Sequence, residues 1–191
     1  MKNTAFIIID LQDGFNDEAY WGGNRNNPQA EQNTRKVLDT WRELKYPVFH
    51  VKHNSVNPKS PLAPGKPGNA IKEIVKPMAD EPVIPKKVNS AFIGTDLEAK
   101  LRAKGITRVV LAGLQTDHCV STSARMAANL GFETIVLSDA TATFDRTSQS
   151  GQKFSAQTIH DINLTSLHDE FATILTTQQL LERVRTHEYA A

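Results

Sequence analysis

The residue best suited to chemistry is the single cysteine of the chain, Cys119. It falls in the first turn of a predicted helix, where unpaired backbone N–H groups and the positive end of the helix dipole favour a thiolate over a thiol. The position therefore predicts a thiol pKa below its ordinary value and a nucleophilic role. The alternative is that Cys119 is a small, buried, apolar side chain, which is common for a lone cysteine.

Asp10 and Lys86 are the charged residues placed to assist such a nucleophile. Asp10 follows an apolar run, so we expect its carboxylate at the rim of a sheet, partly desolvated, where its proton affinity rises and it can act as a base. It could equally cap the following turn, and Lys86 could be an ordinary surface lysine. Beside a carboxylate and a thiolate, an ammonium group would hold both anions and stabilise developing charge. The three residues therefore make more sense as a set than individually.

Apolar runs and helical patterns alternate along the chain. The apolar runs predict strands at residues 5–9, 48–51, 83–84, 109–112, 134–137 and 172–175. The segments between them predict helices at residues 31–44, 96–104, 119–130, 155–167 and 178–185. Most of the runs are too apolar to be half exposed, so the alternation predicts an α/β fold with a parallel, doubly wound sheet covered on both faces.

Such a sheet brings the chemical candidates to one edge. Ligands bind beyond the carboxyl ends of parallel strands, where the strand order reverses. Asp10 follows the first predicted strand, Lys86 follows the third, and residues 113–119 follow the fourth. We therefore expect the carboxylate, the ammonium and the thiol to converge there.

Two long segments fit neither pattern. Residues 54–68 contain four prolines and cannot sustain a helix or a central strand. Loops of this length in compact domains are often functional. Residues 13–28 carry three aromatic side chains, which either line a pocket or pack on the surface: Phe15, Tyr20 and Trp21.

Size and charge limit the classes of function. The chain suits a single domain, residues 1–191, that needs neither disulfides nor a structural metal. Its 22 Lys and Arg residues nearly balance 21 Asp and Glu residues and are scattered, so we expect no nucleic-acid or membrane partner. The apolar run at residues 5–9 is too short to span a membrane and no small-residue cleavage site follows it, which favours a cytoplasmic protein.

Four motifs spread over nearly the whole chain carry a resemblance to a known family. They are Ile8-Ile9-Asp10-Leu11-Gln12-Asp13-Gly14-Phe15, then Lys86 with Ser90-Ala91-Phe92 and Gly94-Thr95, then Gly113-Leu114-Gln115-Thr116 with Cys119-Val120, and finally Gly131 with Asp139-Ala140. In order and spacing they resemble the isochorismatase-like cysteine hydrolases, which include nicotinamidases and related amidohydrolases. The third motif looks similar to a subgroup that includes streptothricin hydrolase.

The resemblance implies both a fold and a site. The fold is a three-layer α-β-α sandwich with a six-stranded parallel sheet in the order 3-2-1-4-5-6. The site is a catalytic triad of Asp10, Lys86 and Cys119. A cis peptide bond is expected between Leu114 and Gln115, and it would turn the N–H of Gln115 toward substrate to form an oxyanion hole with the N–H of Cys119.

The resemblance also implies a substrate pocket and a bond to be cleaved. Phe15 and Phe92 would be walls of that pocket, with Leu114 as a further substrate-binding residue. His53 is a substrate-binding candidate from its own position, and the alternative is an ordinary residue at the end of a strand. Zinc-containing nicotinamidases carry an Asp-x-His motif that this chain lacks, so neither a metal nor another cofactor is expected. Isochorismatases proper, which cleave a vinyl ether, typically lack the cysteine. Cys119 therefore favours hydrolysis of a C–N bond in a small amide, lactam or ureido compound through a thioester intermediate.

Two other functions stay open. One is hydrolysis of a vinyl ether, for which Asp10 alone is essential. The other is a non-catalytic module that binds a ligand or senses redox state through a low-pKa thiol. In either enzyme reading the partner is a small molecule, and the resemblance implies a homo-oligomer, a dimer or a tetramer.

Asp117 is expected to point to solvent, because its charge would otherwise raise the thiol pKa, and His118 to face solvent or a partner subunit.

Overall fold

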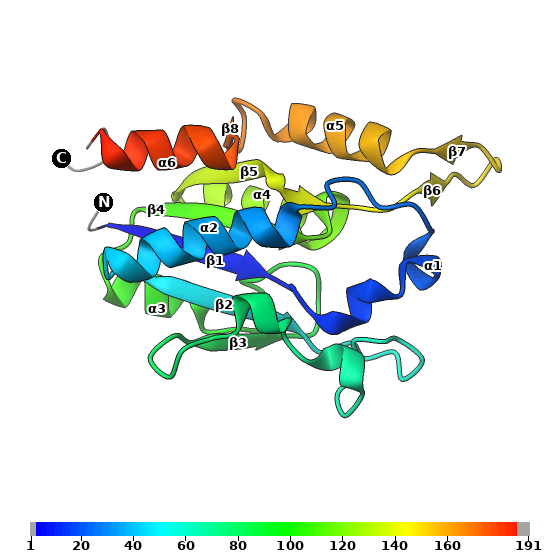
Figure 1. Ribbon diagram of the computed structural model, residues 1–191, viewed down its shortest axis with the longest axis horizontal. Coiled ribbons are helices and arrows are strands. Elements are labelled where there is room, and N and C mark those ends of the chain that lie inside the picture. The colour runs from blue at the N-terminus through cyan, green and yellow to red at the C-terminus, as the bar shows by residue number, and fades with distance from the viewer. Residues whose placement is uncertain (1–2, 187–191) are drawn as a thin grey trace.

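A six-stranded parallel sheet forms the centre of the molecule in the computed structural model, which describes residues 3–186 (Figure 1). Its order is β3-β2-β1-β4-β5-β8, and this confirms the predicted order because β8 is the sixth strand of the sheet. Every predicted strand is present. The strands are β1 (Thr4–Ile9), β2 (Val48–His53), β3 (Val83–Lys86), β4 (Arg108–Leu114), β5 (Glu133–Ala142) and β8 (Thr173–Leu175).

The sheet departs from the predictions beyond the middle of β5. That strand continues to Ala142, because its last residues pair with the end of β4 after a register shift between Leu111 and Gly113. A small antiparallel hairpin follows, formed by β6 (Arg146–Thr147) and β7 (Lys153–Phe154). Strands of two residues are too short to show alternation in a sequence, so the hairpin could not be predicted.

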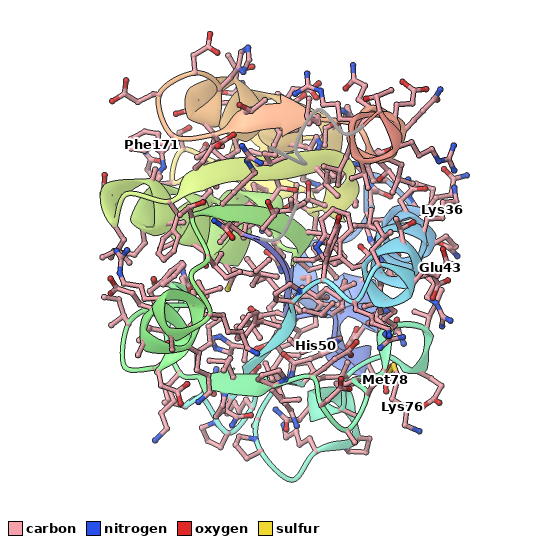
Figure 2. The ribbon with its side chains drawn as sticks, turned by 90° about the vertical axis from the view of Figure 1, so that its left-hand side faces the viewer. Lys36, Glu43, His50, Lys76, Met78 and Phe171 are labelled. Carbon is pink, nitrogen blue, oxygen red and sulfur yellow. The ribbon has the colours of Figure 1, made fainter. Side chains whose placement is uncertain are left out.

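Helices cover both faces of the sheet, as expected. In Figure 2, α2 (Ala30–Glu43) and α6 (Thr177–Arg185) lie on one side, and α3 (Leu97–Ala103) and α4 (Ser121–Asn129) on the other. Helix α5 (Ala156–Leu167) joins the α3 and α4 layer, because its buried leucines belong to the same core cluster. No helix within residues 3–186 is long and apolar enough to cross a membrane.

Alternate residues of β1 fill the two cores. Phe6 packs on the α2 side, where its ring lies 5.7 Å from that of Trp41, whereas Ile7 and Ile9 belong to the cluster on the α3 and α4 side. All of these side chains are fully buried. Burial on both faces explains why the strands are continuously apolar.

Short helical turns occupy the connections after β1, β2 and β4. The first follow β1 as η1 (Asp13–Asn16) and α1 (Glu18–Trp21), and two more are η2 (Pro67–Asn69) and η3 (Glu73–Val75). The predicted helix at residues 119–130 begins earlier, as a π-helical turn η4 (Thr116–Val120) that leads into α4. Cys119 therefore lies within a wide turn and not in the first turn of an α-helix.

Gly113 is required where β4 passes β1. Its φ of 126° lies in a region that favours glycine, and a Cβ atom there would come within 1.9 Å of the carbonyl oxygen of Ile9. This close approach positions the end of β4, and hence η4, against the end of β1.

A buried ionic cluster joins α2, β2 and the segment before β3. Arg42 binds Glu81 through two hydrogen bonds of 2.7 and 2.8 Å, and His50 Nε2 lies 2.9 Å from the same carboxylate. Burial opposes ionisation of Glu81, but the hydrogen bonds from Arg42, Met78 N–H and His50 outweigh it and lower its pKa from 4.5 to about 2. Folding therefore stabilises the ionised form of Glu81 relative to the unfolded chain.

This cluster predicts a pH dependence of stability. Because the folded pKa is depressed, its contribution is complete above the unfolded pKa near 4.5 and is lost as the pH falls toward about 2. We expect Glu81→Gln to lower the free energy of unfolding at neutral pH and to flatten its decline below about pH 5. Urea unfolding over a pH series measures both, and curves for the two proteins that stay parallel would contradict the assignment.

Candidate active site

Asp10, Lys86 and Cys119 meet at the carboxyl edge of the sheet. Lys86 Nζ lies 2.7 Å from Asp10 Oδ2 and 3.1 Å from Cys119 Sγ. Asp10 immediately follows β1, Lys86 is the last residue of β3, and Cys119 lies in η4 after β4. The side chains of Asp10 and Lys86 are fully buried, whereas Cys119 is 8% exposed. The structure therefore brings together the three residues that the sequence singled out.

The carboxylate of Asp10 faces this set and caps no turn. Apart from the ion contact with Lys86, neither of its oxygens has a hydrogen-bond partner in the part of the chain that the structure describes. A carboxylate oxygen of Asp10 and Cys119 Sγ lie within 4.8 Å of each other. Because a buried acceptor without a donor is costly, Asp10 favours any proton that the neighbouring thiol can offer.

The thiol of Cys119 is neutral at ordinary pH. Burial and the charge of Asp10 raise its pKa, and the ammonium of Lys86 offsets this only in part. The pKa of Lys86 is also raised, because Asp10 and Cys119 outweigh the effect of its burial. The prediction of a lowered thiol pKa was thus wrong, because burial and the neighbouring carboxylate raise the pKa and Cys119 does not lie in the first turn of an α-helix. The resting site contains a thiol next to an ion pair.

This protonation state predicts a distinctive alkylation profile. Because Cys119 is the only cysteine, iodoacetamide labelling reports on it alone. We expect slow labelling of the wild type near pH 7, rising steadily into the alkaline range. In Asp10→Asn the ammonium remains without the carboxylate, so labelling near pH 8 should be faster by roughly tenfold or more. Rapid, pH-independent labelling of the wild type around pH 7 would contradict a neutral thiol.

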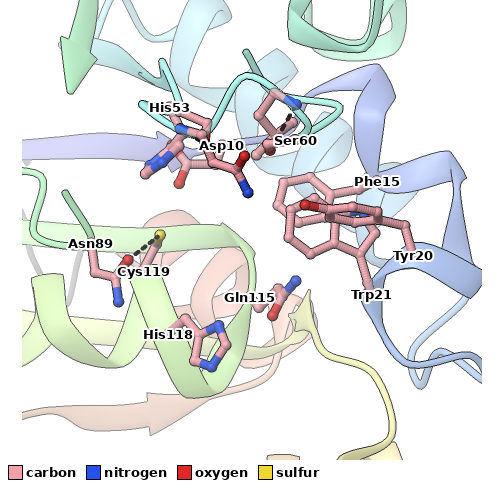
Figure 3. Close-up of a pocket in the computed structure, with 13 residues that line it drawn as sticks. Asp10, Phe15, Tyr20, Trp21, His53, Ser60, Asn89, Gln115, His118 and Cys119 are labelled. Carbon is pink, nitrogen blue, oxygen red and sulfur yellow. Dashed lines mark hydrogen bonds between the residues drawn. The ribbon is translucent and has the colours of Figure 1, made fainter. Parts of the chain in front are cut away.

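A pocket of about 190 Å³ opens beside the sulfur (Figure 3). Facing Cys119 is an aromatic wall in which the Trp21 ring lies 4.6 Å from that of Phe15 and 4.8 Å from that of Tyr20. The complete lining consists of Asp10, Phe15, Tyr20, Trp21, His53, Ser55, Asn57, Ser60, Leu62, Asn89, Gln115, His118 and Cys119. All three aromatic residues of the segment 13–28 line the pocket.

Two of the predicted substrate contacts lie elsewhere. Phe92 packs against Phe132, with 6.2 Å between the centres of the two rings. Leu114 is fully buried in the core on the α2 side. Neither side chain lines the pocket, because both are directed into the sheet layers, so we assign both to the core. The structure does place Phe15 and His53 in the pocket.

Several lining residues were not predicted individually. Ser55, Asn57, Ser60 and Leu62 come from the proline-rich loop, whose length alone signalled a function. Asn89 follows β3, and its Oδ1 lies 3.9 Å from Cys119 Sγ. No local pattern marked these side chains, because only the path of each loop over the sheet edge decides which of them face the cavity.

The peptide bond between Leu114 and Gln115 is cis, as the resemblance implied. The carbonyl oxygen of Gln115 accepts hydrogen bonds from the N–H groups of His118 and Val120, both at 3.1 Å. Its own N–H has no acceptor among residues 3–186. This donor is therefore available to a ligand in the pocket.

Asp117 points inward, which corrects the expectation that it faces solvent. Its carboxylate accepts hydrogen bonds from Arg146 Nε at 2.8 Å and from the hydroxyl of Thr143. Arg146 also donates to the carbonyl oxygen of Trp21 at 2.9 Å and to the side chain of Gln115. The guanidinium of Arg146 thus compensates the charge of Asp117, which water would otherwise solvate. It also links the aromatic wall to the turn that carries Cys119 through hydrogen bonds. His118 is half exposed at the pocket rim.

One group of side chains has the donor atoms of a metal site. Asp10, His53 and Cys119 offer three ligating atoms within 4.8 Å of one another. However, Lys86 Nζ lies 2.7, 2.9 and 3.1 Å from an atom of each. Its ammonium fills the space between them, and its charge opposes a metal cation there.

Comparisons with known proteins identify the family of the chain. The model of the isochorismatase domain matches residues 4–179. An uncharacterized isochorismatase family protein, YrdC, from Bacillus subtilis is 52% identical over 97% of this chain and 99% of that protein. Streptothricin hydrolase from Streptomyces noursei is 31% identical over 74% of this chain and 50% of that protein.

A solved structure extends the agreement to the fold. A putative hydrolase of the isochorismatase family from Chromobacterium violaceum superposes with a TM-score of 0.93 at 40% identity, covering 97% of this chain and 95% of that one. Other matches include a maleamate amidohydrolase, a nicotinamidase and an N-carbamoylsarcosine amidase. The chain is therefore a hydrolase of the isochorismatase family, whose known members include amidohydrolases.

Proposed function

We propose that the protein is a cysteine amidohydrolase that cleaves a C–N bond of a small amide, lactam or ureido compound through a thioester intermediate. One observation carries the proposal. At the edge of the pocket a sulfur lies 3.1 Å from an ammonium that is itself 2.7 Å from a carboxylate without other partners. A nucleophile, a base and a compensating charge are thus in reach of one another.

The raised thiol pKa makes Asp10 the base. The carboxylate takes the proton from Cys119 as the sulfur attacks the carbonyl carbon, and Lys86 balances the negative charge that moves between them. The backbone N–H groups of Gln115 and Cys119 stabilise the oxyanion. Asp10 then returns the proton to the departing nitrogen. Water, deprotonated by Asp10, hydrolyses the thioester and restores the thiol.

Two observations favour amide hydrolysis over the alternatives. None of the described residues that line the pocket is lysine or arginine, so the lining offers no cation to the carboxylates of an isochorismate-like ether substrate. A redox-sensing module requires a low-pKa thiol, and burial beside Asp10 raises the pKa of Cys119 instead. Amidase and amidohydrolase relatives support the same choice.

An ammonia-release screen tests the proposal. Wild-type protein is incubated with small amides, lactams and ureido compounds, and Cys119→Ala serves as the matched control. We expect the wild type alone to hydrolyse at least one compound, releasing ammonia or an amine from an amide or ureido compound or opening a lactam to its amino acid. Absence of C–N hydrolysis across the screen, or equal release by the variant, would refute it.

A further inference from the structure

His53 is a pocket residue in direct contact with the reactive set. It is the last residue of β2 and stands opposite Lys86 in the sheet register. Lys86 Nζ lies 2.9 Å from Nδ1 of its ring. An ammonium group has only donors, so Nδ1 must be the acceptor and cannot carry a proton.

The ring is therefore neutral, with its proton on Nε2. Burial and the positive charge of Lys86 lower the pKa of His53, and the charge of Asp10 opposes them only in part. This direction agrees with the geometry, since a protonated ring would place an N–H against the ammonium. The contact with Lys86 thus selects a single tautomer, and the remaining donor of the ring is Nε2–H.

That donor is open and held in place. Nε2 has no hydrogen-bond partner in the described chain and is not among its enclosed polar atoms. The backbone of His53 is clamped, because its N–H donates to Gln12 Oε1 at 2.8 Å and its carbonyl oxygen accepts from Gln12 and Asn69, both at 3.1 Å. A positioned N–H without a partner, on a residue that lines the pocket, is a ligand-binding group.

We propose that the Nε2–H of His53 binds a second hydrogen-bond acceptor of the substrate, so that the enzyme selects small uncharged amides that carry another carbonyl oxygen or a ring nitrogen near the scissile group. The proposal rests on the amidohydrolase function above. One of the two ring nitrogens of His53 lies within 4.8 Å of Cys119 Sγ, so the imidazole stands beside the site of attack and the second acceptor is expected only a few bonds from the attacked carbon. With no lysine or arginine in the described lining, the pocket offers no counterion to a negatively charged remainder, so the proposed substrate carries none.

Kinetics on two matched amides test this assignment. Malonamide carries a second carbonyl group, and butanamide has no second acceptor. We expect the wild type to prefer malonamide. Because His53 also contacts Lys86, His53→Phe should lower kcat/KM for both amides, and the loss should be about tenfold to a hundredfold larger for malonamide, with the additional part mainly in KM. His53→Gln, which restores an N–H donor, should recover much of the loss. The ratio of wild type to variant cancels the different intrinsic reactivities of the two compounds.

An equal loss on both amides would overturn the proposal, because it would show that His53 acts only by positioning Lys86. The ring state has a separate readout, which is ¹⁵N NMR of histidine-labelled protein. We expect the Nε2-protonated tautomer in the wild type and a mixed population in Lys86→Met, and an Nδ1-protonated ring in the wild type would also overturn the proposal. Failure of the wild type to hydrolyse any amide in the wider screen would instead refute the amidohydrolase function itself.

Discussion

Replacing Cys119 with alanine is expected to reduce amide hydrolysis by a factor on the order of 10⁴ or more, because the variant has no atom that can form the thioester. The fold should survive. Cys119 is a small side chain at the pocket edge, and its loss leaves the contact between Lys86 and Asp10 intact. Steady-state ammonia release and thermal unfolding of the same preparation measure the two effects.

Asp10→Asn provides the comparison that separates the enzyme mechanisms. On an amide, both Cys119→Ala and Asp10→Asn should be nearly inactive, because the first lacks the nucleophile and the second lacks the acid that protonates the departing nitrogen and the base that activates water. On an isochorismate-like ether, Asp10 alone would be essential. If Cys119→Ala cleaves such an ether and the wild type hydrolyses no amide, the proposed amide hydrolysis is wrong. Ether cleavage is then the reaction of this site.

Replacing Lys86 with methionine is expected to destabilise the protein by about 3–5 kcal/mol, because it leaves the charge of Asp10 buried without a partner. Both side chains are fully buried. Replacing the partner residue instead, as in Asp10→Asn, should lower the free energy of unfolding by less. Lys86 would keep two neutral acceptors, the carbonyl oxygen of Val88 at 3.1 Å and the ring of His53 at 2.9 Å, whereas Asp10 has no substitute for Lys86 among the described residues.

A double-mutant cycle measured by urea unfolding quantifies this pair. The double variant Asp10→Asn/Lys86→Met removes both charges and should be more stable than Lys86→Met alone. Thermal unfolding of each single variant supplies an independent ranking. Equal losses for the two single variants, or additive losses in the double variant, would show that the two charges are not coupled as the structure indicates.

Much of the architecture was predictable because the relevant signals are local. Apolar runs precede Asp10 and the turn that carries Cys119, a shorter run precedes Lys86, and a parallel sheet places the carboxyl ends of these strands at one edge. The sequence therefore predicts that the three reactive groups lie close together, although it gives no distance between them. It also identified the two loops that line the pocket, from their aromatic and proline content, although it did not identify which of their side chains face inward.

The errors concern side chains whose state depends on distant charges. Burial and the charge of Asp10, which follows the neighbouring strand β1, raise the pKa of Cys119. Asp117 turns inward because Arg146 arrives from an unpredicted hairpin. Phe92 and Leu114 belong to the core because packing between layers, and not proximity in sequence to the motifs, decides where they point.

The sequence by itself determined the alternation of strands and helices and the chemical identity of the groups at one edge, since apolar periodicity and chain connectivity are properties of the linear chain. The order of the sheet was expected from the resemblance to a known family. The tertiary structure alone decided where the protons reside. Its contacts favour a neutral thiol at Cys119 and an imidazole protonated at Nε2 of His53, because electrostatic interactions act through space between residues that only folding brings within about 3 Å of one another.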